Sequence, residues 1–228
     1  MGLGRFSPIL MVGAPGSGKG TQAGLIGEAC RIPHVATGDL LREHVQRGTA
    51  LGSAAHAYME RGDLVPDDIV MHTLIERFQK PDAERGVLLD GFPRTLAQAH
   101  ALDRRLASHA GGVWAVLYLV VTESSLVPRL TGRRVCVGCQ GTFHVALQPL
   151  PQGDICPMCG NNLVQRPDDR EEVIRHRLAI YLQETQPMLE YYAGQNVIYS
   201  VNGDRPVEEI RADLLNVLRR LEPTLIAS

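Results

Sequence analysis

The sequence is poor in aromatic residues, carries almost no net charge and lacks a long hydrophobic run. Aromatic side chains make up 5% of its 228 residues, and 23 basic residues nearly balance 25 acidic ones. A net charge of −2 gives no electrostatic reason to expect broad nucleic-acid binding. The longest apolar run, Val113 to Val121, is nine residues, too short to cross a bilayer. Because the N-terminus also lacks a signal-sequence pattern, we expect a cytoplasmic protein with no membrane partner.

Lysine is scarce as well. Lys19 and Lys80 are the only lysines, and the other 21 basic residues are arginines. Coding bias is the simplest interpretation, because surface arginine and lysine are often interchangeable for solubility. The scarcity still excludes one class of protein. A GTPase would read guanine with an Asn-Lys-x-Asp segment, and neither lysine lies in one.

Short apolar runs alternate with helical patterns along the chain. This alternation predicts an α/β fold with a parallel sheet covered by helices on both faces. The expected strands are residues 6–12, 34–36, 87–89, 114–121 and 197–201. The expected helices include residues 39–47, 53–61, 67–79, 95–108, 123–131, 169–193 and 206–221. Residues 37–65 and 132–168 interrupt the alternation, which predicts a core of 1–36, 66–131 and 169–228 with two insertions.

A glycine-rich loop, Gly13 to Thr21, follows the first predicted strand and precedes a helical pattern. Glycines let consecutive backbone N–H groups turn toward an anion, and the helix N-terminus adds its positive dipole. Lys19 supplies a charge for the outer phosphates, and the Thr21 hydroxyl is a candidate ligand for Mg²⁺. The general pattern has Ser or Thr directly after the lysine, whereas Gly20 intervenes here. The loop therefore predicts a nucleoside triphosphate site of a particular subtype.

Charged residues downstream indicate a second phosphate site. Asp90 and Arg94 follow the third predicted strand, at the edge where parallel sheets bind ligands. Arg129 and Arg133 are four residues apart, which we expect to place them on one helix face. Arg166 precedes the predicted helix that carries Arg177. Solvated surface arginine is the alternative for each one; together, beside a phosphate loop, they are typical of phosphoryl transfer.

Four of the five cysteines form two pairs of equal spacing. Cys136 and Cys139 make one C-x-x-C pair, Cys156 and Cys159 the other, and 16 residues separate the pairs. Such pairs predict a closed tetrahedral Zn²⁺ site with a structural role. Two disulfides, idle thiols or an iron–sulfur cluster are the alternatives. The fifth cysteine, Cys30, is expected to pack in the core.

These motifs resemble the adenylate kinase family, and in particular its bacterial long-lid, zinc-containing type. The resemblance covers nearly the whole chain in order. It includes the glycine loop, the segments Thr37-Gly38-Asp39 and Asp90 to Arg94, both cysteine pairs and Val201-Asn202-Gly203. It implies a P-loop NTPase-type five-stranded parallel sheet, a helical AMP-binding insertion at 37–65 and a zinc-bearing lid at 132–168. The implied activity is reversible phosphoryl transfer from Mg-ATP to AMP, giving two ADP.

The resemblance also implies two sets of binding residues. The expected ATP contacts are Gly16, Ser17, Gly18, Lys19, Gly20, Thr21, Arg133, Thr142, Phe143 and Arg205. The expected AMP contacts are Thr37, Arg42, Asp63, Leu64, Val65, Gly91, Phe92, Pro93, Arg94, Gln98, Arg166 and Arg177. Gln98 would read the adenine edge, since an amide both donates and accepts. Lys19, Arg94, Arg133, Arg166 and Arg177 would offset charge on the transferred group, while the closing lid excludes water.

Two departures from the family pattern are visible. Asp63 stands where many relatives have lysine, so contact there would be through the backbone. Gln140 follows Cys139, whereas Gly160 follows Cys159 as in a regular zinc knuckle, which leaves the first turn open.

Three functions remain to be distinguished. A kinase for another nucleoside monophosphate, or a GTP-using relative, differs from an AMP kinase only in pocket specificity. A zinc-ribbon nucleic-acid module would need a basic stripe on the cysteine segment. Residues 135–165 contain no lysine or arginine, so we expect no nucleic-acid partner. We expect the kinase to be a monomer.

Overall fold

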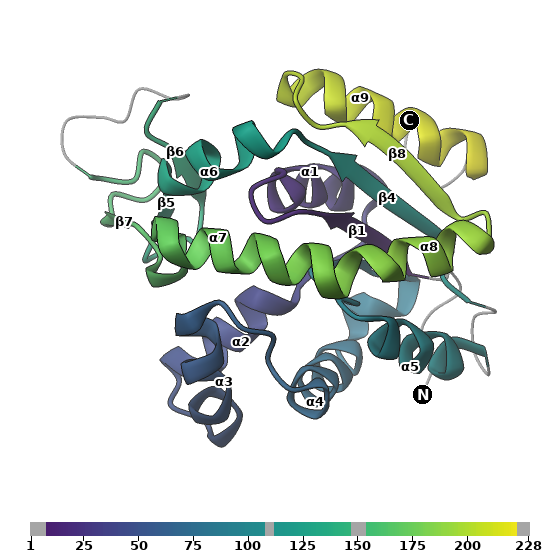
Figure 1. The fold of residues 1–228 in the computed structure, drawn as a ribbon, viewed down its shortest axis with the longest axis horizontal. Coiled ribbons are helices and arrows are strands. Elements are labelled where there is room, and N and C mark those ends of the chain that lie inside the picture. The colour runs from purple at the N-terminus through teal and green to yellow at the C-terminus, as the bar shows by residue number, and fades with distance from the viewer. Residues whose placement is uncertain (1–7, 108–111, 147–153, 223–228) are drawn as a thin grey trace.

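The computed structural model describes residues 8–107, 112–146 and 154–222. A five-stranded sheet lies at the centre, with strand order β2-β3-β1-β4-β8 and every neighbouring pair parallel (Figure 1). The strands are β1 (Ile9–Gly13), β2 (His34–Ala36), β3 (Leu88–Asp90), β4 (Ala115–Val120) and β8 (Ile198–Asn202). The predicted fold class, an α/β protein with a five-stranded parallel sheet, is confirmed.

Helices cover both faces of this sheet (Figure 1). They are α1 (Lys19–Cys30), α2 (Thr37–Gln46), α3 (Ala50–Arg61), α4 (Asp67–Phe78), α5 (Leu96–Ala107), α6 (Glu123–Thr131), α7 (Glu171–Ile180), α8 (Gln186–Gly194) and α9 (Val207–Leu221). Short 3-10 helices span Pro81–Arg85 and Pro167–Asp169. Among the helices of these described ranges, none is long and apolar enough to span a membrane.

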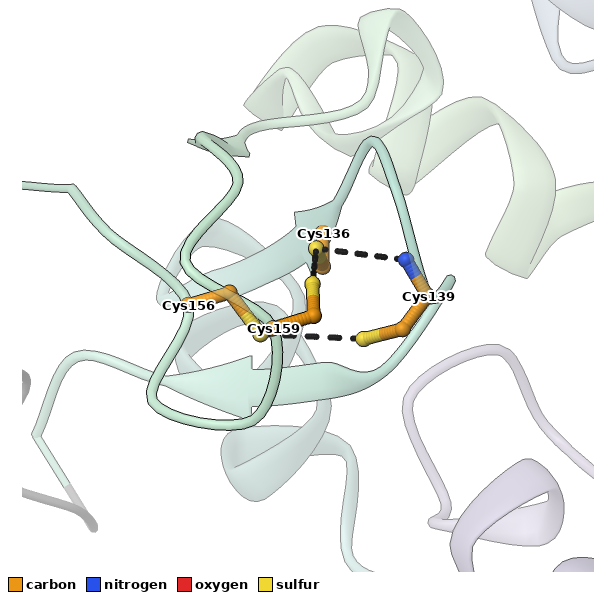
Figure 2. A group of neighbouring side chains, drawn as sticks. All are labelled: Cys136, Cys139, Cys156 and Cys159. Atoms are coloured by element: carbon orange, nitrogen blue, oxygen red, sulfur yellow. Dashed lines mark hydrogen bonds between the residues drawn. The ribbon is translucent and has the colours of Figure 1, made fainter.

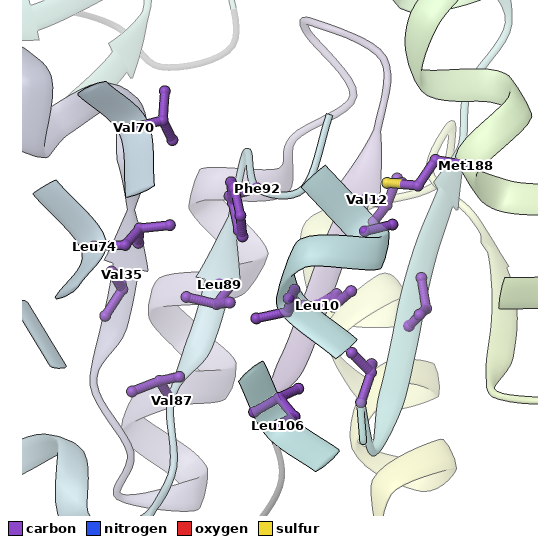
Figure 3. Close-up of a cluster of buried hydrophobic side chains, with 14 of the residues drawn as sticks. Leu10, Val12, Val35, Val70, Leu74, Val87, Leu89, Phe92, Leu106 and Met188 are labelled. Atoms are coloured by element: carbon purple, nitrogen blue, oxygen red, sulfur yellow. The ribbon is translucent and has the colours of Figure 1, made fainter. Parts of the chain in front are cut away.

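Alternating side chains of the strands build two separate cores. Leu10 and Val12 of β1 point to one face, where they join buried residues of α4, α5 and α8 (Figure 3). Ile9 and Met11 point to the other face and pack with α1 and α9. All four are at most 5% exposed. A strand buried on both faces reads as a continuous apolar run, and this is why the strand positions could be predicted.

The segment between β2 and α4 contains α2 and α3, as the sequence predicted. Gly52 allows the two helices to approach closely, because a Cβ on Gly52 would lie 2.2 Å from the carbonyl oxygen of His44. Thr49 caps α3 by accepting a hydrogen bond from the Gly52 N–H at 3.1 Å. The helix starts earlier than expected, at Ala50, because this cap precedes it.

The cysteine segment forms a small antiparallel sheet in the order β6-β5-β7, which the sequence did not predict (Figure 1). Its strands are β5 (Arg133–Cys136), β6 (Thr142–His144) and β7 (Leu163–Val164). Strands of two to four residues are too short to show a period of two in the sequence. The buried residues of this segment are few among the described residues: Val135 of β5, and a cluster of Cys136, Cys156 and Leu163 against which Phe143 packs.

The long helix predicted over 169–193 is interrupted. Between α7 and α8, residues Tyr181–Thr185 form a π-helix. Such a turn inserts an extra residue and is frequent at functional sites. Here it directs the Thr185 hydroxyl to the backbone carbonyl of Arg94, to which it donates a hydrogen bond of 2.7 Å.

One expectation is wrong. Arg129 and Arg133 do not share a helix face, because α6 ends at Thr131 and Arg133 begins β5. Arg129 donates to the carbonyl of Gly203 at 2.9 Å, whereas Arg133 pairs with Asp169. Residues 6–7 of the first predicted strand and residue 108 of the fourth listed helix lie outside the described residues, as do residues 147–153 of the predicted lid.

Candidate active site

The carboxyl ends of three central strands bring the predicted site segments together. Asp90, the last residue of β3, is paired with Met11 of β1 on one side and with Ala36 of β2 on the other. The glycine loop follows β1 directly, and Thr37 follows β2. Thr37 does not cap α2 but donates its hydroxyl hydrogen to the carbonyl of Gly91 at 2.9 Å. The order of the strands therefore gathers segments that are far apart in the sequence.

The glycine loop wraps around the N-terminus of α1. Gly16 and Gly18 have φ values of 88° and 90°, in the left-handed region that favours glycine. A Cβ on Gly16 would also lie 2.9 Å from the carbonyl oxygen of Leu126. The first N–H groups of α1 have no partner within the helix, so the loop can present them to an anion. The Ser17 hydroxyl is buried and has no hydrogen-bond partner in the part of the chain that the structure describes.

Lys19 lies in the middle of a strongly charged region. Its ammonium donates to the carbonyls of Gly13 at 2.8 Å and Ala14 at 2.9 Å. Burial lowers its pKa to about 8, opposed by the carboxylate of Asp90 and reinforced by Arg94, Arg177 and Arg133. Three arginines from distant segments thus act on the same charge. A polyphosphate bound here would counter all of them.

The pKa of Lys19 predicts how the expected binding of ATP at the glycine loop depends on pH. Only the ammonium form attracts phosphate, so KM for ATP should be constant below about pH 8 and then rise, approaching about tenfold per pH unit. The measurement is KM for ATP across the range from about pH 6.5 to about pH 9.5. In Lys19→Arg the guanidinium stays charged, and the rise should disappear. A KM that stays flat through pH 9 in the wild-type enzyme would contradict this assignment.

A cavity opens beside the loop, between the α2–α4 segment and α7. Ten of the twelve expected AMP contacts line it: Thr37, Arg42, Asp63, Leu64, Val65, Gly91, Arg94, Gln98, Arg166 and Arg177. Of the other two, Phe92 is 1% exposed and packs in the sheet core, and Pro93 is buried and does not line the cavity. Apolar residues that sequence reasoning missed also line the cavity, among them Leu41 and Val70.

Ion pairs hold the arginines of this region in place. Arg133 of β5 makes a bidentate pair with Asp169, with N–O distances of 2.7 and 2.5 Å, and Asp169 is fully buried. Arg177 lies 2.8 Å from the Asp168 carboxylate. Asp168 and Asp169 are neighbours in the chain, so these two ion pairs link the small sheet to α7.

A second set of pairs joins the two insertions. Asp39 of α2 accepts hydrogen bonds from Arg42 at 2.5 Å and from Arg166 at 3.2 Å. Although burial opposes it, the two arginines hold the pKa of Asp39 below its usual range. Arg166 and Asp39 are 127 residues apart in sequence. The structure therefore has the two segments predicted to be insertions in contact through Asp39 and Arg166, and Arg166 also lines the cavity.

The arginines carry more positive charge than the neighbouring carboxylates neutralise. Burial, together with repulsion from Arg177, lowers the pKa of Arg94 to about 10. Burial and repulsion from Arg42 do the same for Arg166. The Nε of Arg42 is buried and makes no hydrogen bond with any described residue. Buried cations under mutual repulsion are stabilised when an anion binds between them, so this cavity is suited to a phosphate group.

The four paired cysteines meet at one end of the small sheet (Figure 2). Their Sγ atoms all lie within 4.8 Å of one another, and two of the separations are 3.3 and 3.6 Å. Four sulfurs around a zinc ion at about 2.3 Å would be about 3.8 Å apart, so the donor set fits a tetrahedral metal. Hydrogen bonds from Asn161 lower the pKa of Cys159 to about 6, which favours a thiolate there. Although a backbone hydrogen bond from Gly141 opposes it, burial and bonding to the other three sulfurs raise the pKa of Cys139 to about 12.

The two cysteine turns have the same backbone form despite their different sequences. The N–H of Gln140 donates to the carbonyl of Cys136 at 3.1 Å, and the N–H of Gly160 donates to that of Cys156 at 2.9 Å. Gln140 reaches this geometry with a φ of 58°, close to the 72° of Gly160. The departure at Gln140 therefore leaves the turn intact.

Three expected ATP contacts are not brought to the loop by any side-chain contact in the described ranges. Thr142 and Phe143 lie on β6, where Phe143 packs against the cysteine cluster. The Arg205 side chain pairs with Asp213 of α9. Its segment nevertheless runs past the loop, because a Cβ on Gly203 would lie 3.5 Å from the carbonyl oxygen of Ser17. The roles of these residues toward ATP stay predictions.

A parallel sheet with a phosphate loop after its first strand, and an arginine-lined cavity beside that loop, defines a P-loop kinase of small phosphorylated substrates. The family model for adenylate kinase matches residues 11–197. The chain is 41% identical over 210 residues to an adenylate kinase of Lachnospira eligens, covering 92% of this chain and 99% of the relative. It is 42% identical over 213 residues to one of Methanocella arvoryzae, covering 93% and 99%. The chain belongs to the adenylate kinase family.

Proposed function

We propose that this protein catalyses reversible transfer of the γ-phosphoryl group of ATP to AMP, giving two molecules of ADP. One observation carries the proposal: Arg94 and Arg177 line the cavity and also act on the charge of Lys19 in the phosphate loop. These two guanidinium groups therefore lie between two phosphate sites. Relatives along almost the whole chain are named adenylate kinase, which supports AMP over other acceptors.

The reaction needs no covalent intermediate on the protein. An oxygen of the AMP phosphate attacks the γ-phosphorus, and the bond to the bridging oxygen of the leaving ADP breaks. The protein holds both nucleotides in line, with Lys19 on the outer phosphates of ATP and Arg94 and Arg177 around the moving group. Arg133 and Arg166 come from the small sheet and its flank, so closure of this segment completes the positive charge and excludes water.

Magnesium is expected to accompany ATP, and the residues present fit it. The Asp90 carboxylate lies over the start of α1, with its Oδ2 3.5 Å from where a Cβ of Gly20 would be. The Thr21 hydroxyl, in the first turn of α1, is the second candidate group. The ion would supply charge neutralisation on the phosphate oxygens.

We infer that the four-cysteine site holds Zn²⁺ and that the metal is structural. All four ligand positions are filled by cysteine, which leaves none for substrate. The division into a core of residues 1–36, 66–131 and 169–228, an AMP-binding insertion of 37–65 and a lid of 132–168 belongs to the same proposal. The ion pairs between Arg166 and Asp39 and between Arg133 and Asp169 support boundaries at which the lid contacts the other two parts.

The direct test is ADP formation from ATP and AMP by the purified protein, with and without Mg²⁺, measured by nucleotide chromatography. We expect ADP at twice the rate of AMP loss, because each turnover gives two ADP, and loss of the reaction without Mg²⁺. UMP, CMP and GMP should be poorer acceptors than AMP. A preference for UMP would assign the chain to another nucleoside monophosphate, and no ADP from any acceptor would overturn the proposal.

We also propose that the enzyme acts as a monomer in the cytoplasm. Four clustered cysteines stay available to a metal only in a reducing compartment, where disulfides are rare. Every residue expected to contact ATP or AMP is present in this chain, so the proposed site requires no residue from a second copy. A scattering mass near that of 228 residues would support the monomer.

A further inference from the structure

Gln98 is fixed from two sides before any ligand is present. It lies in the first turn of α5, is 3% exposed and lines the cavity. Its Oε1 accepts a hydrogen bond from the backbone N–H of Arg94 at 2.7 Å. Its Nε2 donates to the Oδ1 of Asp67 at 2.6 Å. Asp67 is the first residue of α4, 31 residues earlier in the chain, and its own side chain is exposed.

These two partners determine which way the amide points. A backbone N–H can only donate, and an ionised carboxylate can only accept. A flipped amide would set its NH₂ against the N–H of Arg94 and its oxygen against the carboxylate of Asp67. Both contacts would then be repulsive, and the Gln98 amide itself is buried, so the flip is disfavoured. In the observed orientation one N–H and one oxygen lone pair are left for a ligand in the cavity.

We propose that Asp67 is a specificity-determining positioning residue: by locking the Gln98 amide it selects a 6-aminopurine over a 6-oxopurine. The inference rests on the proposed function, in which AMP occupies this cavity. A 6-aminopurine accepts at N1 and donates from its amino group, which matches the free N–H and free lone pair of Gln98. A 6-oxopurine donates at N1 and accepts at O6, which matches only the flipped amide. A site with fixed, buried hydrogen-bonding groups rejects the mismatched ligand strongly.

Asp67 acts through Gln98 and does not itself line the cavity. A substitution at Asp67 therefore changes the hydrogen bond that orients the Gln98 amide but leaves the residues that line the cavity unchanged. In Asp67→Asn, the new side chain can turn its NH₂ toward a flipped Gln98 and accept the alternative orientation. In Asp67→Ala, the hydrogen bond from Gln98 Nε2 to position 67 is lost, so residue 67 favours neither orientation of the amide. In both variants the N–H of Arg94 still favours the observed orientation. Asn can equally accept a hydrogen bond from the observed amide through its Oδ1, so both variants are expected to discriminate less than wild type without reversing the preference.

The test is equilibrium binding of AMP and of inosine 5′-monophosphate, which carries oxygen in place of the amino group. Discrimination is measured as the Kd for inosine 5′-monophosphate divided by the Kd for AMP. We expect this ratio to fall about tenfold or more in Asp67→Asn, with weaker AMP binding as part of the change. Asp68→Asn is the matched control. It removes a carboxylate from the same turn of α4, and Asp68 makes no hydrogen bond to Gln98 in the described part of the chain.

Two outcomes would overturn the inference: a ratio that stays within about twofold of wild type in Asp67→Asn, or an equal fall of the ratio in Asp68→Asn. If Asp67 had only a structural role, its substitution would weaken the binding of both nucleotides by the same factor and leave the ratio of their Kd values unchanged. Failure of the proposed function is distinguished in the wild-type protein itself. There, absence of AMP binding and turnover would remove the function, whereas AMP turnover with an unmoved ratio would remove only the role of Asp67.

Discussion

Replacing Lys19 by alanine should lower kcat by on the order of 100- to 1,000-fold, the usual cost of removing one group that stabilises transition-state charge. Lys19 is the only lysine or arginine in the glycine loop, Gly13 to Thr21. The measurement is kcat and KM for ATP at saturating AMP, at about pH 7.5. A loss mainly in kcat would show that the ammonium acts on the transition state and not only on binding.

The same variant should keep its fold. Because burial lowers the pKa of Lys19 to about 8, the folded protein holds that proton less tightly than the unfolded chain, and at pH 7 the charge opposes folding. Thermal unfolding should therefore occur at an unchanged or higher temperature. Lys80→Ala is the matched control, since Lys80 is the other lysine and lies before the short helix Pro81–Arg85. Near-normal turnover in Lys19→Ala would contradict the assignment of the phosphate loop.

Removing one cysteine ligand should cost the protein its metal and the small sheet its structure. We expect one Zn²⁺ per chain in the wild-type protein and none retained tightly by Cys136→Ala. The buried residues of this sheet are too few to hold it without a metal, and a structural zinc site contributes about 10 kcal/mol or more to folding. Arg133 would then lose its position, so turnover should fall as well. Metal content by elemental analysis and a separate low-temperature unfolding step would measure both effects.

Cys30→Ala is the control for this experiment. Cys30 is buried on α1, and burial raises the pKa of its thiol to about 11, so it remains an uncharged core residue. The variant should keep its zinc and lose some core stability. Freshly purified wild-type protein without bound metal would rule out the zinc site. Loss of metal from Cys30→Ala would show that the metal depends on the core.

The strands and the phosphate loop could be predicted because they depend on local patterns. A doubly buried strand such as Ile9–Gly13 is a plain apolar run, and the glycine loop follows it at once. The strands of the small sheet could not be predicted, since two to four residues carry no periodic signal. The mistake at Arg129 and Arg133 came from applying helical spacing to Arg133, which lies beyond the predicted helix 123–131 and begins β5.

The charged residues of the site could be predicted from the sequence, whereas its apolar residues and their packing could not. Charged residues such as Arg94 and Arg177 stand out by type, and the structure places both at one cavity. Leu41 and Val70 line the same cavity but have the signature of ordinary core residues, so nothing in the sequence marked them. The bond between Gln98 and Asp67 depends on how α4 and α5 pack, which no local pattern encodes.

The π-helix at Tyr181–Thr185 determines how α8 is rotated about the helix axis relative to α7, which precedes it. Each residue of an α-helix advances the helix by about 100°, so the extra residue turns the face of α8 relative to that of α7 by about this angle. With it, Arg177 looks into the cavity while Met188 and Tyr192 look into the sheet core. Deleting a single residue there would restore regular α-helical hydrogen bonding but rotate α8 relative to α7, so that one of these two faces would turn toward water. The π-helix thus lets α7 and α8, joined end to end, face the cavity and the hydrophobic interior at once.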